Sequence, residues 1–195
     1  TIEIPAGSLT ASTTLRSLDD LIDDDAETIV VEISSVSGGD GATEDGDQQE
    51  TVTITDDEAT PVVTLATSAN SFTENAANPA VTLTVSMTAA ATSNTTILLG
   101  VSGTATGGGV DYSIGSTTLV IPAGSTSITT TLSSNDDPYY DDGETIIVEI
   151  SSVSGSTAAE SGTQSETVTI TDDEAQPTVS LTVGSNNLTE AAGVT

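Results

Sequence analysis

The chain has 195 residues and an extreme charge balance, with 30 acidic side chains against one basic residue, Arg16, and no histidine. A net charge of −29 excludes nucleic acid as a partner, because phosphate binding needs a basic surface, and it argues against docking on an anionic membrane. No apolar run approaches the roughly 18–20 residues of a membrane span, so we expect no membrane insertion in this segment. Hydrophobic residues make up 35% of the chain, which is enough for a folded core.

The sequence repeats itself with a period of 116 to 117 residues. IPAGSLTASTTL from Ile4 returns 117 positions later as IPAGSTSITTTL, and ETIVVEISSVSG from Glu27 returns at the same offset as ETIIVEISSVSG. Such a period is too long for a solenoid unit and suits a small domain. We therefore predict the C-terminal half of one repeat (residues 1–59, the N-terminal segment), one complete repeat (60–175, the central repeat) and the first strand of another (176–195, the C-terminal segment).

Short stretches of alternating apolar and polar residues run through the central repeat. Turn signals such as the glycines at 107–109 and ProAlaGly at 122–124 separate them, and no window shows the period of an amphipathic helix. This pattern predicts an all-β fold made of antiparallel seven-stranded immunoglobulin-like β-sandwich repeats in tandem. The expected strands are 63–66, 81–87, 97–101, 117–121, 128–132, 146–150 and 168–170.

The acidic residues of the central repeat collect at strand ends and in loops. Loops that follow alternate strands lie at the same pole of such a sandwich, so we expect these acids to crowd together at one end. Like charges about 4–6 Å apart raise one another's pKa and oppose folding. Calcium, which takes about 6–8 oxygen ligands, offsets this crowding, whereas zinc and copper favour the His and Cys that the chain lacks.

Four motifs follow one another in the central repeat: GTA…GVDY at 103–112, IPAG at 121–124, DD…DDGE at 136–144 and TVTITDDE at 167–174. Together they resemble Calx-beta domains, the calcium-binding sandwiches of sodium–calcium exchangers and bacterial surface proteins. The resemblance covers the whole chain as half a domain, a full domain and an opening strand. It implies Ca²⁺ as the bound ion and tandem repeats of a bacterial-type extracellular adhesin or filament protein.

The resemblance also implies metal ligands in each part of the chain. One position departs from the family, which often has Glu where Asp141 stands, and this implies a ligand that reaches less far and binds through water. No catalytic residue and no organic cofactor are implied. The implied ligands of the central repeat are Glu74, Asp111, Asp136, Asp137, Asp141, Glu144, Asp172, Asp173 and Glu174. Their counterparts in the N-terminal segment are Asp19, Asp20, Asp24, Glu27, Asp56, Asp57 and Glu58, and Glu190 opens the next set.

The acids that end the last strand stand at the junctions between repeats, so we expect calcium to hold neighbouring repeats at a fixed angle. The expected function is a stiff structural segment of a secreted or cell-surface adhesin or fibre. Its partners are neighbouring repeats of the same chain, with self-association into fibres left open.

Two other binding functions stay open. One is a calcium-sensing regulatory domain, and the other is an adhesion module that contacts a ligand through Tyr139 and Tyr140. Catalysis is not expected. Paired carboxylates serve glycoside hydrolysis, but the chain lacks an aromatic platform for sugar and has no His to activate its Ser and Thr side chains.

Overall fold

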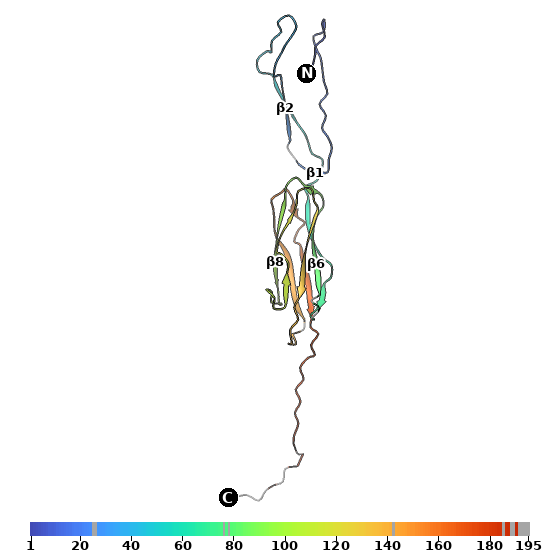
Figure 1. Cartoon of the computed structure of the whole chain (residues 1–195), viewed down its shortest axis with the longest axis vertical. Helices are drawn as coiled ribbons and strands as arrows, with labels where there is room; N and C mark the ends of the chain where they lie inside the picture. The colour runs from blue at the N-terminus through green and yellow to red at the C-terminus, as the bar shows by residue number, and fades with distance from the viewer. Residues whose placement is uncertain are drawn as a thin grey trace.

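The computed structural model describes residues 1–24, 27–75, 77, 79–141, 143–184, 186–187 and 190. Within these residues the chain forms strands, turns and irregular segments, and it forms no helix. The molecule is elongated, with the N-terminal segment at one end of the central repeat and the C-terminal segment leading away from the other (Figure 1). The parts of the chain therefore follow one another along a single long axis.

The central repeat is a sandwich of two five-stranded sheets. One sheet contains β4 (Val62–Thr67), β6 (Ala80–Met87), β9 (Tyr112–Ile114), β11 (Ser127–Ser134) and β13 (Ala159–Glu160), in the spatial order β13-β4-β6-β11-β9. The other contains β5 (Ser71–Thr73), β8 (Thr95–Gly103), β10 (Thr118–Ile121), β12 (Glu144–Ser154) and β14 (Ser165–Thr171), in the order β10-β8-β12-β14-β5. The stretches predicted from alternation lie, within one residue, in β4, β6, β8, β10, β11, β12 and β14. The predicted number of seven strands is too low, because the sheets also contain β5, β9 and β13, which are too short to show alternation in the sequence.

Strand pairing departs from the antiparallel expectation where the first part of the repeat divides between the two sheets. β4 pairs with β6 in antiparallel fashion but with β13 in parallel, and β5 pairs in parallel with β14. The expectation of a purely antiparallel sandwich is therefore wrong at these edges. The first strands of the repeat, β4 and β5, run in the same direction as the late strands beside them, β13 and β14.

The alternation in the sequence is the burial pattern of the sheets. Alternate residues of β6 from Val81 to Met87 and of β12 from Ile146 to Ile150 are buried and belong to one core cluster. The residues between them are polar or only partly buried. Each fully buried Val, Leu or Ile side chain contributes about 1.5–3 kcal/mol, so this shared core holds the two sheets face to face.

The N-terminal segment contains one hairpin and the contact with the central repeat. The hairpin pairs β2 (Thr28–Glu32) with β3 (Gln49–Thr53) in antiparallel fashion. The contact is a short parallel pairing between β1 (Ile22–Asp23) and β7 (Ala90–Ala91), a strand in the loop between β6 and β8. The described part of the chain contains no helix that could serve as a membrane span.

Candidate metal-binding sites

The acids of the central repeat meet at the pole from which the C-terminal segment leaves. They are brought there by the end of β11, the start of β12 and the end of β14. The described residues of this pole form two groups of three carboxylates, and within each group one oxygen from every member lies within 4.8 Å of the others. We call Asp111, Asp141 and Glu144 the inner cluster, and Asp136, Asp173 and Glu174 the outer cluster.

The other three predicted ligands of the central repeat are tied to these clusters by backbone hydrogen bonds. The Asp137 amide donates to Glu74 Oε1 at 3.0 Å, and the Asp141 amide donates to Asp172 Oδ2 at 2.6 Å. The other oxygen of Asp172 accepts from the Glu174 amide at 2.8 Å. The structure thus gathers all nine predicted acids at one pole, where Glu74 and Asp172 also order the loop backbone. Asp142 of the same loop lies outside the described residues.

Several of these carboxylates are buried, and the central repeat has no Lys or Arg to balance their charge. Glu74 and Asp111 are only 3% and 6% exposed, and the one basic side chain of the protein, Arg16, belongs to the N-terminal segment. Among the described residues, Glu144 Oε2 and Glu174 Oε2 are buried oxygens without a hydrogen-bond partner. A buried carboxylate oxygen is costly unless a donor or a cation meets it. Each cluster therefore contains one oxygen that fits a bound metal ion.

The pKa values of three carboxyl groups at this pole are raised, which also indicates a site for a cation. Burial, followed by repulsion from Asp141, raises the pKa of Glu74 to about 7. Burial, followed by its hydrogen bond with Asp111, raises the pKa of Glu144 to about 7. The pKa of Glu174 rises to about 7 first through its hydrogen bond with Asp172 and then through burial. Without a cation, then, these groups hold protons near neutral pH, and a metal ion would take the place of those protons.

The pKa of Asp172 moves in the opposite direction. Burial works against its ionisation, but the amides of Glu174 and Asp141 both donate to the carboxylate and together lower its pKa. The two backbone donors therefore stabilise the ionised form of Asp172. Its negative charge raises the pKa of Glu74 and Glu174 beside it.

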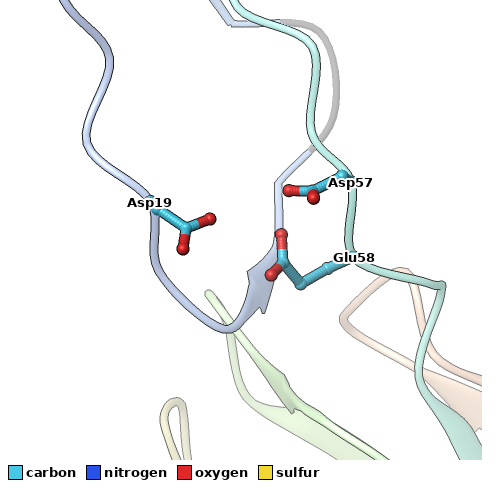
Figure 2. Close-up of side chains that lie close together, drawn as sticks. All are labelled: Asp19, Asp57 and Glu58. Atoms are coloured by element: carbon cyan, nitrogen blue, oxygen red, sulfur yellow. The ribbon is translucent and has the colours of Figure 1, made fainter.

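The outer cluster exists a second time in the N-terminal segment. Asp19, Asp57 and Glu58 bring one oxygen each to within 4.8 Å of one another, and Figure 2 shows Asp19 facing the other two across a short gap. Their counterparts one period later are the members of the outer cluster, Asp136, Asp173 and Glu174. We call this first copy the junction cluster, since it lies beside β1, where the N-terminal segment meets the central repeat (Figure 2).

The loop hydrogen bond beside the cluster is repeated too. The Asp24 amide donates to Asp56 Oδ2 at 3.3 Å, just as the Asp141 amide donates to Asp172 Oδ2. The pKa of Glu58 is raised, first by its hydrogen bond with Asp56 and then by burial. All seven acids predicted for this segment line one hollow of about 180 Å³: Asp19, Asp20, Asp24, Glu27, Asp56, Asp57 and Glu58.

Two residues lie apart from this picture. Glu190, predicted to open a further ligand set, is exposed and belongs to none of the three clusters. Asp23, which the sequence did not single out, is 3% exposed and accepts a hydrogen bond at 2.6 Å from the Thr157 hydroxyl of the central repeat. The predicted ligands are acids that recur at matching positions of the two repeats. Asp23 is not one of them, because Tyr140 stands at its position one period later.

The chain is similar to a known protein family and to several solved structures. The family model for the Calx-beta domain matches residues 56–174. Similar solved structures include the apo form of the Calx CBD1 domain, with 16% identity and a TM-score of 0.46 over 58% of this chain and 99% of that chain. CBD12 from CALX1.2 is 18% identical with a TM-score of 0.45, over 53% of this chain and 41% of that chain. WR4, a C. elegans MSP family member, is 8% identical with a TM-score of 0.33, over 55% and 96%. No curated protein matches the chain.

Proposed function

The chain belongs to the Calx-beta domain family, and we propose that it is a calcium-binding structural segment of a secreted or cell-surface adhesin or fibre. In this proposal the carboxylate clusters hold Ca²⁺, and calcium at the junction between repeats stiffens the array. One observation carries it: the same three carboxylates converge in both repeats, and the first set lies beside the contact between them. A cation there acts on two parts of the chain at once.

The residues present fit calcium in the kind of atom they offer. Every candidate ligand is a carboxylate, the hard oxygen donor that Ca²⁺ prefers, and the chain has no His or Cys to favour a softer metal. The inner cluster, the outer cluster and the junction cluster would each contribute three such groups. The bound ion supplies positive charge, which gives Glu144 Oε2 and Glu174 Oε2 a partner and removes the repulsion among the acids.

Stiffening follows from where the junction cluster stands in the chain. Asp19 precedes β1, whereas Asp57 and Glu58 precede β4 by only a few residues. An ion shared by these three side chains therefore ties the loop that carries β1 to the link that enters the central repeat. Pro61 in that link is fully buried, which leaves the link little freedom.

Small-angle scattering on the full chain with calcium and with chelator tests the stiffening. Calcium is expected to narrow the distribution of shapes and fix the maximum dimension. Glu58→Gln should abolish this response because Glu58 belongs to the junction cluster. Glu149→Gln is the control, since it makes the same change at an exposed acid of β12 outside the clusters and should leave the response intact. An unchanged profile in a parent chain that binds calcium would contradict the stiffening.

The binding constant and the solution mass distinguish this role from its rivals. Extracellular calcium modules bind at about 10⁻⁴–10⁻³ M, whereas sensors bind at about 10⁻⁷–10⁻⁵ M. Calorimetry on the full chain is expected to give the weaker range, and a micromolar constant would favour the calcium-sensing alternative. A mass that grows with calcium would favour a fibre subunit, and a monomeric mass would favour a spacer.

A further inference from the structure

A dipeptide in the acidic loop of the N-terminal segment forms the contact with the central repeat. Ile22 pairs with Ala90 and Asp23 with Ala91 in parallel register. Asp23 is almost completely buried, and its Oδ2 accepts a hydrogen bond at 2.6 Å from the Thr157 hydroxyl. A carboxylate is buried at a cost unless it is hydrogen-bonded, so this bond selects one arrangement of the two parts.

The surface that receives the dipeptide is built by the central repeat alone. The Gly124 amide donates to the Ala91 carbonyl at 3.0 Å, and the Ser93 hydroxyl donates to the Gly155 carbonyl at 2.7 Å. These bonds join the loop that holds β7 to the loops on either side of it. The small side chains of β7 leave its backbone open to pairing. Any further copy of this repeat would carry the same surface at the pole that faces the preceding repeat.

The loop at the opposite pole presents a matching dipeptide. Tyr139 and Tyr140 stand one period after Ile22 and Asp23. The Tyr139 amide donates to Asp137 Oδ1 at 2.8 Å, as the Ile22 amide donates to Asp20 Oδ1 at 2.9 Å. The next residue after each dipeptide also makes the same bond, which is the amide contact to Asp56 or Asp172 described above. Both loops are therefore folded alike around their dipeptides.

The second dipeptide is exposed where the first is engaged. Tyr139 is 71% exposed and Tyr140 is 39% exposed. Burial of a tyrosine ring in an interface removes a large apolar area from water and therefore favours docking. We propose that Tyr139 and Tyr140 form the docking surface for a following copy of the repeat. They pair with the residues of that copy that correspond to Ala90 and Ala91. This docking rests on the tandem arrangement of repeats in the proposed function. The surface and its partner are thus two opposite poles of one repeating unit.

The exchange of Asp23 for Tyr140 changes the chemistry of this second junction. A phenol can donate or accept a hydrogen bond, so the counterpart of Thr157 keeps a partner. The junction also carries one negative charge less, and the two rings bring more apolar area into the contact. The second junction therefore depends more on burial and less on offsetting charge than the first.

Disulfide trapping tests this pairing in the full chain extended by a further copy of residues 80–175, which continues the repeat from Thr195 in register. The protein has no Cys, so any disulfide reports only the introduced pair. Tyr139→Cys is combined with Ala90→Cys of the added copy. The reference pair is Ile22→Cys with Ala90→Cys of the original copy, whose register is known. The control combines Tyr139→Cys with Leu98→Cys of the added copy, a half-exposed site on the middle of β8.

The test pair is expected to close at a rate similar to the reference pair and at least about tenfold faster than the control, because docking raises the effective concentration of the two thiols. Closure no faster than the control, while the reference pair closes, would overturn the docking. Calcium binding is measured separately on the unmodified chain. Rapid closure without calcium binding would leave the docking standing and remove the metal function, and calcium binding with slow closure would do the reverse.

Discussion

The N-terminal segment and the central repeat share a sequence but share only part of a fold. The hairpin β2–β3 pairs Ile29 with Val52, in the same register in which β12 and β14 pair Ile146 with Val168. In contrast, residues 10–17 form no strand, although the matching residues of the central repeat form β11. The hairpin is local in sequence, whereas β11 takes its partners from β6 and β9 in the first part of the repeat. Within these 195 residues, the N-terminal segment therefore forms the local pairing of the repeat and not the long-range pairing.

Burial follows the same division. Leu132 on β11 is fully buried, whereas its counterpart Leu15 is 51% exposed, and Val168 is fully buried where Val52 is 44% exposed. The carboxylate clusters divide too. The outer cluster and the junction cluster use only residues from the second half of a repeat and form in both places. The inner cluster includes Asp111 from the first half, and among the described residues it forms only in the central repeat. Paired substitutions at matching positions of the two segments test this difference.

The largest contrast is expected between Leu132→Ala and Leu15→Ala. The first removes a fully buried side chain from the core and should lower the free energy of unfolding of the central repeat by about 2–5 kcal/mol. The second changes a half-exposed side chain and should cost less than about 0.5 kcal/mol. Urea unfolding followed by circular dichroism measures both. Equal costs would mean that Leu15 is as deeply buried as Leu132, against the exposure of its side chain.

Gly155→Ala and Gly38→Ala form the next pair. Both glycines have positive φ angles, 92° and 81°, so an alanine at either is strained by about 1–2 kcal/mol. Only at Gly155 does the added Cβ also meet the chain, 2.6 Å from the Asn94 carbonyl oxygen, while nothing lies within 4 Å at Gly38. The Gly155 variant should therefore lose about twice as much stability in the same urea assay or more. A smaller loss at Gly155 would show that the Asn94 loop yields freely.

Glu144→Gln should weaken calcium binding at the inner cluster by about tenfold, because charge count tunes the affinity of such sites. Glu27→Gln is the matched change in the N-terminal segment, where the described residues form no second inner cluster. Its effect on calorimetric affinity is expected to be smaller. Equal losses for the two variants would mean that the inner cluster is not a separate site.

The smallest effect is a pH dependence of stability without calcium. Glu74 and Glu144 have pKa values raised from 4.5 to about 7, so the folded state holds more protons than the unfolded state in this window. The resulting stabilisation is complete below pH 4.5 and is lost as the pH rises through about 7. The melting temperature in chelator should fall by a few degrees across this window, and Glu74→Gln should flatten the slope. A rising melting temperature would contradict the burial of these uncompensated acids.

Much of this architecture could be predicted because it depends on local pattern. The alternation along β6 and β12 fixed which residues face the core, and the parity of the loops placed Asp111 and Asp172 at one pole. The parallel edge formed by β5 with β14 could not be predicted, because it arises from a three-residue strand with no periodicity of its own. The burial of Asp23 depends on a contact with another repeat, and nothing near it in the sequence encodes that contact.

The junction between the N-terminal segment and the central repeat contains both a long-range contact and a carboxylate cluster. Asp23 is held by the Thr157 hydroxyl, a long-range contact that needs the whole central repeat. The junction cluster beside it is built from residues of the N-terminal segment, with Asp19 before β1 and Asp57 and Glu58 in the link between β3 and β4. In the proposed function, calcium would therefore bind the N-terminal side of a junction whose other side is the folded central repeat.

Thermal melting of the full chain with calcium, magnesium or chelator tests the central claim most directly. The account predicts a melting temperature several degrees higher in calcium than in chelator, with a much smaller shift in magnesium, which gives up its water reluctantly. The double variant Asp172→Asn/Asp173→Asn should lose most of the shift, while Glu149→Gln, an exposed acid on β12 outside the clusters, should keep it. A melting temperature that does not respond to calcium would contradict the account.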